Sequence, residues 1–218
     1  MQQNIRRIPA PLKVLSNLLI HPGMALINLP FGPIWKESDL YHFNEKRFIK
    51  VIDDALGNVS KIEKTVDVLF EKGFKNLFLI GVGGTYSHFL PIQFISGQLS
   101  ELPVHAVQAA EFVLQGNKQF SGDSLCVFCS RSGDTREIVD AIQYCNNAGA
   151  TTLAFVCHAD TPVCMESTHH FVSFAEDDHL AECFYLQLYA FLFRVLMRLG
   201  DFPKYETFVE QIHGITPY

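Results

Sequence analysis

The chain has 218 residues, of which 48% are hydrophobic and 18% charged, and its formal net charge at pH 7 is −6. This composition excludes an intrinsically disordered chain, and the length predicts one domain plus extensions with a sizeable core. No basic run is longer than two residues, as at Arg6-Arg7, which argues against nucleic acid as a partner. No apolar run reaches the ~18 residues of a membrane span, so we also expect no membrane partner.

Residues 1–45 are expected to be an irregular N-terminal extension, because five prolines prevent a long helix there. Residues 45–72 are predicted to form one long helix. Its apolar residues recur at steps of four and three, as in a seam of heptads: Phe48, Ile52, Ala55, Val59, Ile62, Val66 and Leu69. The helix could pair with a second copy or pack on its own sheet, and the sequence favours neither. Gly57-Asn58 weakens its middle.

From residue 76 onward, apolar strands alternate with helices. Strands are predicted at 76–82, 104–107, 124–129, 151–157 and 170–174, and a long apolar helix at 180–199. This alternation predicts an α/β fold, with helices on both faces of a five-stranded parallel sheet. The expected domain covers residues 46–200. Residues 201–218 would be a C-terminal tail or the start of a missing second domain.

A polar turn at residues 130–135, Ser-Arg-Ser-Gly-Asp-Thr, stands between a buried strand and an amphipathic helix. The first N–H groups of a helix lack intrahelical partners and favour an anion, and serine and threonine hydroxyls can donate to the same oxygens. The turn therefore predicts a phosphate site. The alternative is ordinary capping, because Asp134 and Glu137 have the spacing of a capping box. The two interpretations can coexist.

A second glycine turn, at residues 83–87, also follows a strand and opens a helix. Ligands of parallel sheets bind at the carboxyl ends of strands, so the two turns could face one ligand. The turn does not predict a dinucleotide site, because Tyr86 occupies the third glycine position of G-x-G-x-x-G. No phosphate-loop pattern with lysine is present, and we expect no cofactor.

The six cysteines, at positions 126, 129, 145, 157, 164 and 183, are mostly in apolar stretches. Cys126-x-x-Cys129 resembles half a zinc site, but side chains three apart in a strand point to opposite faces. We therefore expect buried free thiols, no metal, and a reducing, cytoplasmic location.

The segments SRSGDTRE (130–137) and GVGGTYS (81–87) resemble the sugar isomerase (SIS) domain family, whose pattern is S-x-S-G-x-T-x-E. The resemblance covers residues 45–199. Within this family, the sequence most resembles the first SIS domain of fructosamine-6-phosphate deglycases, which are relatives of the isomerase half of glucosamine-6-phosphate synthase. The resemblance implies a phosphosugar ligand, which is a phosphorylated sugar or a fructosamine 6-phosphate. It also implies a phosphate held by Ser130, Ser132 and Thr135, with Gly133 shaping the turn.

Further contacts follow from the same resemblance. Arg131 would approach the sugar, and Gly83, Gly84 and Thr85 would contact the sugar or its phosphate. Glu111, after the second strand, lies near the ligand edge or forms a surface salt bridge.

In the two-domain enzymes the catalytic glutamate belongs to an E-x-x-H-G-P-like segment of the second SIS domain, and this chain has no such segment. The catalytic residues are therefore not assigned. His88, His158 and His179 are candidates for proton transfer, and each has the alternative of an ordinary polar loop or cap residue.

Two functional hypotheses follow. The first is an enzyme of the phosphosugar isomerase or deglycase class, complete as a single-domain oligomer or truncated. The second is a non-catalytic phosphosugar-binding module or remnant. A missing second domain would leave apolar surface, which predicts a homodimer or larger homo-oligomer. No helix-turn-helix precedes the domain, which argues against a DNA-linked regulator.

Overall fold

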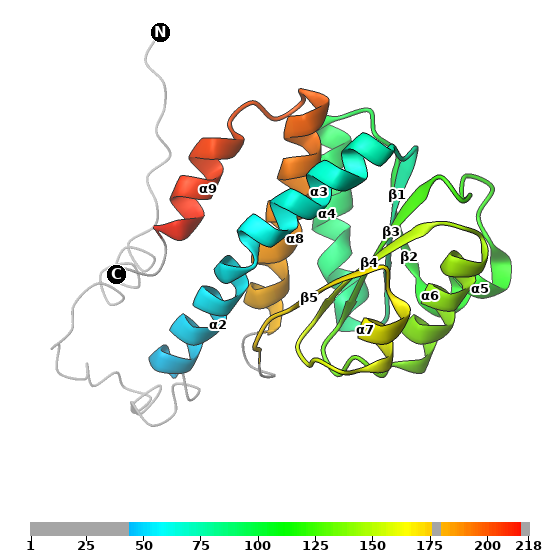
Figure 1. Ribbon diagram of the computed structural model, residues 1–218, viewed down its shortest axis with the longest axis horizontal. Coiled ribbons are helices and arrows are strands. Elements are labelled where there is room, and N and C mark those ends of the chain that lie inside the picture. The colour runs from blue at the N-terminus through cyan, green and yellow to red at the C-terminus, as the bar shows by residue number, and fades with distance from the viewer. Residues whose placement is uncertain (1–43, 176–179, 215–218) are drawn as a thin grey trace, which may run out of the picture. The chain divides into compact units, whose positions relative to one another are not determined.

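The computed structural model of the chain describes residues 44–175 and 180–214. Within them, five parallel strands lie between two layers of helices (Figure 1). The strands have the order β2-β1-β3-β4-β5. Their bounds are Asn76–Gly81 (β1), Val104–Gln108 (β2), Ser124–Ser130 (β3), Thr151–Val156 (β4) and His169–Val172 (β5). The predicted α/β fold with a five-stranded parallel sheet is confirmed. The predictions for residues 1–43 lie outside the described residues.

Each face of the sheet carries its own core, because alternate strand residues point to opposite sides. Leu77, Leu79 and Cys129 pack with α3 (Val59–Lys72), α4 (Gly84–Leu99) and α8 (Leu180–Leu199). The other face packs with α5 (Ala109–Gln115), α6 (Arg136–Asn147) and α7 (Pro162–Glu166). Cys126 belongs to this second core, so it points away from Cys129 as predicted, and all six cysteines are buried free thiols.

The helical stretch predicted over residues 45–72 is confirmed, but it is divided into two helices at the predicted weak point. α2 (Glu45–Gly57) ends at Asn58, and α3 begins at Val59. The Asn58 amide group donates to the carbonyl oxygen of Val172 at 2.9 Å and to Ser173 Oγ at 2.6 Å. These acceptors reorient the chain at Asn58 and fasten the junction to the end of β5.

The apolar seam packs inside the domain, which answers the question that the sequence left open. Val59, Ile62, Val66 and Leu69 are buried, and α3 and α8 are also joined by charge. Arg194 donates to both carboxylate oxygens of Asp67, at 3.0 and 2.7 Å, and these hydrogen bonds lower the pKa of Asp67.

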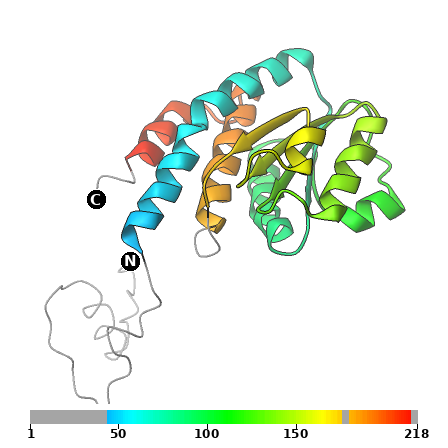
Figure 2. The same ribbon diagram turned by 60° about the horizontal axis from the view of Figure 1, so that its bottom comes forward.

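The C-terminal helix α9 (Tyr205–His213) lies beside α2 and α8 (Figures 1 and 2). Ile212 is buried in a small cluster with Ile52, Leu56 and Ala190. Among the helices of the described part, none is both long enough and apolar enough to cross a membrane.

Candidate functional site

The strand order places two turns side by side at one edge of the sheet. The chain passes from β1 to β2 through α4, on one face of the sheet. It passes from β3 to β4, in the opposite direction along the sheet, through α6 on the other face. The order therefore reverses between β1 and β3, which are hydrogen-bonded neighbours. In open parallel sheets this switch point is where ligands bind. The β1 turn (residues 83–87) and the β3 turn (residues 130–135) both follow carboxyl ends there.

The β3 turn is closed by its own first serine. The Gly133 N–H donates to Ser130 Oγ at 3.0 Å, and Ser130 is buried. Gly133 has a φ of 73°, which favours glycine. A Cβ atom at Gly133 would lie 2.3 Å from Thr161 Oγ1. The Gly133 carbonyl oxygen accepts a hydrogen bond from Val163 N at 3.0 Å, so the turn is braced against α7.

The hydroxyls on the open side of this turn are unused by the protein. Ser132 is exposed and Thr135 is half-buried, and within the described ranges neither hydroxyl makes a hydrogen bond. Thr135 is the residue directly before α6. The first N–H groups of that helix point out of its N-terminus and have no partners within the helix. Hydroxyl donors and helix N–H groups together form a site suited to a phosphate.

The capping box that the spacing of Asp134 and Glu137 offered as an alternative does not form. α6 begins at Arg136, so Thr135 occupies the N-cap position and makes no side-chain cap bond. The third helical residue is Ile138, whose N–H bonds the Thr135 carbonyl oxygen at 3.0 Å. Capping therefore does not consume the polar groups of this turn.

The β1 turn uses its hydroxyl internally. Thr85 Oγ1 donates to the Val82 carbonyl oxygen at 2.9 Å and accepts from Val82 N at 3.1 Å. Gly83, with a φ of 54°, and Gly84 expose their backbone at the sheet edge. A Cβ atom on Gly81 would lie 2.6 Å from Tyr86 N, so glycine lets α4 begin close to the strand.

Arg131 belongs to the β3 turn, and Glu111 lies beyond the β1 turn on the other side. Arg131 is half-buried, and its charge helps to lower the pKa of the Cys157 thiol, after the larger effect of a hydrogen bond from Cys183. Arg131 therefore lies toward the end of β4. Glu111 is exposed on α5, one strand beyond β1.

Two of the three predicted proton-transfer histidines belong to the described residues, and their surroundings differ. His88 lies between α4 and α8, with its ring against Phe184 and Tyr185 at 5.8 and 5.0 Å between centroids. Burial lowers the pKa of His88, and the charge of Glu182 opposes this effect. His158 is exposed after β4, and His179 lies outside the described residues.

Sequence reasoning missed Thr161 and Tyr86. Thr161, the residue before α7, fills the space behind Gly133. Tyr86 was considered only as a departure from a glycine pattern, yet it lines a hollow beside the β1 turn. Neither has a local sequence signal, because each acts through residues more than twenty positions away.

A model of the SIS domain family matches residues 72–197, more than half of the chain. Fructosamine deglycase FrlB of Bacillus subtilis strain 168 is 26% identical over 157 residues, covering 69% of this chain and 48% of the deglycase. Isomerizing glutamine–fructose-6-phosphate aminotransferase 2 of Homo sapiens is 34% identical over 79 residues, covering 36% of this chain and 11% of the aminotransferase. The chain thus spans about half, or less, of these relatives.

Among solved structures, a similar one is the C-terminal domain of glucosamine-fructose-6-phosphate aminotransferase from Francisella tularensis. Its TM-score is 0.64 at 15% identity, covering 84% of this chain and 55% of that one. At this identity the likeness establishes the fold of the described domain.

Proposed function

This chain belongs to the SIS domain family, and we propose that it binds a phosphorylated sugar at the β1/β3 edge of its sheet. The observation that carries the proposal is the pair of hydroxyls at Ser132 and Thr135. They stand beside the N-terminus of α6 and make no hydrogen bond in the described part of the chain. The net charge of −6 makes such local donors necessary, because the chain has no broad positive field to attract an anion.

In this proposal the phosphate lies on the β3 turn. Ser132 and Thr135 donate their hydroxyl protons to it, and the first N–H groups of α6 point at the same oxygens. Ser130 Oγ already accepts the Gly133 N–H, so its own proton remains for the phosphate. Gly133 fixes the shape of the turn through its packing on Thr161.

The sugar then extends over the β1 turn. Gly83 and Gly84 offer exposed backbone without side chains, so the sugar can lie close to the strand end. The Thr85 hydroxyl stabilises this turn internally, because it donates to the Val82 carbonyl oxygen. Arg131 contacts the sugar from the β4 side.

A second candidate function is chemistry on the bound sugar, of the isomerase or deglycase class. The match of 69% of this chain to a protein named fructosamine deglycase favours it. Fixing the phosphate would hold the reacting carbons against an acid/base pair, and that positioning is a large part of catalysis. A turnover assay on the tightest ligand, following release of the amine or interconversion of aldose and ketose, distinguishes this function from binding alone.

The binding proposal is tested by thermal shift with hexose 6-phosphates, each beside its unphosphorylated sugar. A ligand at ~100 times its dissociation constant stabilises the folded chain by ~2.7 kcal/mol, so only the phosphorylated sugars should raise the melting temperature. The double variant Ser132→Ala/Thr135→Ala should lose this response at unchanged basal stability. Ser60→Ala, an exposed serine on α3, is the matched control and should keep it. Equal responses to both kinds of sugar would contradict the phosphate assignment.

We further propose that the chain forms a homodimer or larger homo-oligomer through the outer face of α4. Leu90 and Phe94 there are 44% and 67% exposed, and with Leu102 they border a hollow of about 420 Å³. Exposed apolar patches of this kind are typical of interfaces. Light scattering should show that Phe94→Lys reduces the particle mass, whereas a monomeric wild-type chain would contradict the proposal.

The buried free thiols also support a reducing location such as the cytoplasm.

A further inference from the structure

Four of the six buried cysteines form two pairs, which lie on opposite faces of the sheet. Cys157, directly after β4, pairs with Cys183 in the first turn of α8. Cys126 of β3 pairs with Cys145 of α6. In each pair the two thiols are hydrogen-bonded to each other, so only a small movement would bring the sulfurs to disulfide distance.

Only one of these pairs has the surroundings of a reactive thiol. Cys157 is 7% exposed, whereas the other three thiols are fully buried. The S–H group of Cys183 donates to the Cys157 sulfur and lowers the pKa of the Cys157 thiol, and the charge of Arg131 lowers it further, although burial opposes both effects. A lowered pKa raises the fraction of thiolate, which is the form that attacks an oxidant. In the other pair, the hydrogen bond with Cys145 and burial raise the pKa of Cys126, so this group stays a thiol.

The register of the sheet places the exposed thiol beside the β3 turn. Ser130 of β3 is paired with Val156 of β4. Arg131 and Cys157 are therefore the next residues beyond two neighbouring strand ends, which agrees with the effect of the Arg131 charge on this thiol. A change of charge or position at the Cys157 sulfur is thus felt directly in the turn.

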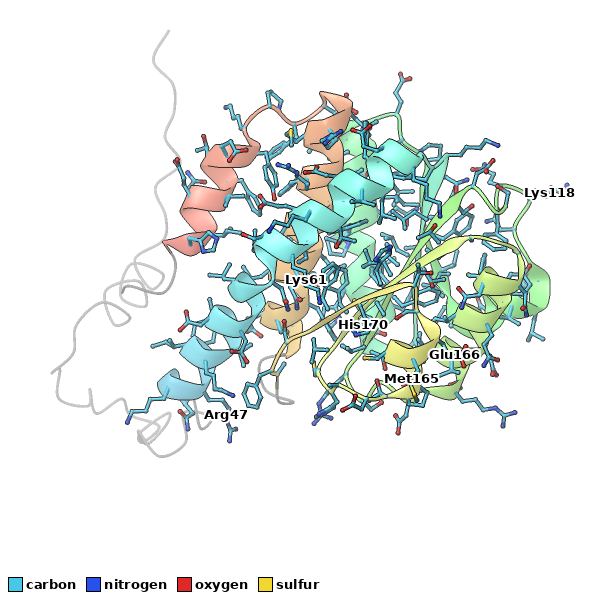
Figure 3. All side chains as sticks on the ribbon, viewed as in Figure 1. Arg47, Lys61, Lys118, Met165, Glu166 and His170 are labelled. Atoms are coloured by element: carbon cyan, nitrogen blue, oxygen red, sulfur yellow. The ribbon has the colours of Figure 1, made fainter. Side chains whose placement is uncertain are left out.

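Hydrogen bonds hold the second thiol of this pair in place. The buried Gln187 side chain donates to the Cys183 sulfur at 3.4 Å and accepts from Ser173 Oγ at 3.1 Å. Ser173 directly follows β5, and in β5 the carbonyl oxygen of His170 accepts a hydrogen bond from Lys61 of α3 at 3.2 Å (Figure 3). The first turn of α8 is therefore fastened to the end of β5, and β5 to α3, so Cys183 is held facing the other thiol.

We propose that Cys157 and Cys183 form a redox modification site, in which hydrogen peroxide converts the two thiols into one disulfide bond. The Cys157 thiolate attacks a peroxide oxygen, so that an S–O bond forms, the O–O bond breaks and hydroxide leaves. The Cys183 sulfur then attacks this sulfenic acid, so that the S–S bond forms, the S–O bond breaks and a second hydroxide leaves. The two thiol protons and the two hydroxides give two waters, and two electrons pass from the sulfurs to the peroxide. In a reducing compartment such a disulfide is transient.

The test is peptide mapping of the full chain, first reduced and then treated with hydrogen peroxide, with the remaining thiols alkylated in denaturant before digestion. Trypsin would leave both cysteines in one peptide, because no lysine or arginine lies between Arg136 and Arg194. A protease that cleaves after glutamate separates them at Glu166. The main crosslink should join Cys157 to Cys183, and dithiothreitol should reverse it.

Three other mapping results would overturn the proposal. They are the absence of any crosslink, a main crosslink between Cys126 and Cys145, and a main crosslink from Cys157 to its other neighbour, Cys129. The mapping needs no substitution and no sugar, so its outcome is separate from that of the proposed function.

Variants then assign the order of the two steps. Cys183→Ala removes the second thiol, so peroxide should leave Cys157 as a sulfenic acid that dimedone labels. Cys157→Ala should lose both the crosslink and the labelling. Cys145→Ala, which removes a thiol of the other pair, is the matched control and should keep the crosslink. Crosslinking that is lost equally in all three variants would contradict the assignment to this pair.

Discussion

The β1 turn and the β3 turn are built on one plan and do different work. Each follows a buried strand, contains a glycine with positive φ and opens a helix. In the β1 turn, the Thr85 hydroxyl is hydrogen-bonded to the backbone of Val82, so the turn presents backbone and no free hydroxyl from Thr85. In the β3 turn, Ser132 and Thr135 keep their hydroxyls available, and the support comes instead from Thr161 and Val163 of the α7 region.

The difference shows where a binding turn obtains its rigidity. A turn that holds itself together through its own side chains has few left for a ligand. The β3 turn uses only Ser130 internally and is otherwise held by packing on Thr161 and by the main-chain bond from Val163, so the hydroxyls of Ser132 and Thr135 stay on the open side. Preorganised donors of this kind bind an anion without a further ordering cost.

The largest expected effect comes from adding one methyl group to each turn. Gly133→Ala should lower the free energy of unfolding by ~2–3 kcal/mol, because alanine is strained at this φ and its Cβ would overlap Thr161. Gly84→Ala should be neutral or slightly stabilising, since nothing lies within 4 Å of its Cβ position. Urea unfolding of both variants measures the contrast.

A second substitution separates overlap from backbone strain. In Gly133→Ala/Thr161→Gly the overlapping atoms are gone but the positive φ remains, so part of the lost stability should return. A double variant no more stable than Gly133→Ala would show that the packing on Thr161 does not brace the turn.

A smaller effect is expected from removing one hydroxyl in each turn. Thr85→Val should cost ~1–2 kcal/mol of stability, because the half-buried hydrogen bonds with Val82 are lost. Thr135→Val should change stability by less than about 0.5 kcal/mol, since its hydroxyl has no partner in the described residues, yet it should weaken phosphosugar binding. Urea unfolding measures the stability of both variants, and calorimetric titration measures their phosphosugar binding. A loss of stability in Thr135→Val but not in Thr85→Val would contradict the structural role of Thr85 and the binding role of Thr135.

The smallest effect concerns the helix after the β1 turn. Burial places the folded-state pKa of His88 below its unfolded value of ~6.5, so protonation favours the unfolded chain. The stability that neutral His88 contributes is present above about pH 6.5 and is lost as the pH falls through the folded-state pKa. His88→Phe should therefore flatten the acid decline of stability.

Urea unfolding of His88→Phe and wild type on both sides of pH 6.5 measures this difference. His169, whose pKa is also lowered by burial, is present in both chains and contributes equally to both slopes. If the free energy of unfolding changes with pH by the same amount in both chains, His88 does not contribute to the acid decline of stability.

Local patterns in the sequence predicted the sheet well. Residues 77–80 are apolar without interruption because β1 is buried on both faces, and glycines follow because α4 starts close to the strand. The motif at 130–137 predicted which hydroxyls stand at the start of α6, since strand, turn and helix are contiguous there.

Contacts between distant segments were out of reach. The helix break at Asn58 depends on acceptors at Val172 and Ser173, more than one hundred residues away. The helix start at Arg136 moved the cap from Asp134 to Thr135, a shift of one residue that no propensity resolves. Glu111 was placed near the ligand edge, but its hollow with Tyr86 required the strand order.

The hydrogen bond from Val163 N to the Gly133 carbonyl gives the β3 turn a built-in reporter. The amide proton of Val163 belongs to α7, and its acceptor belongs to the turn, so it can exchange with solvent only when the two separate. A ligand that stiffens the turn should slow this exchange without touching α7. A single amide signal, thirty positions along the chain from the turn, would then record occupancy of the anion site.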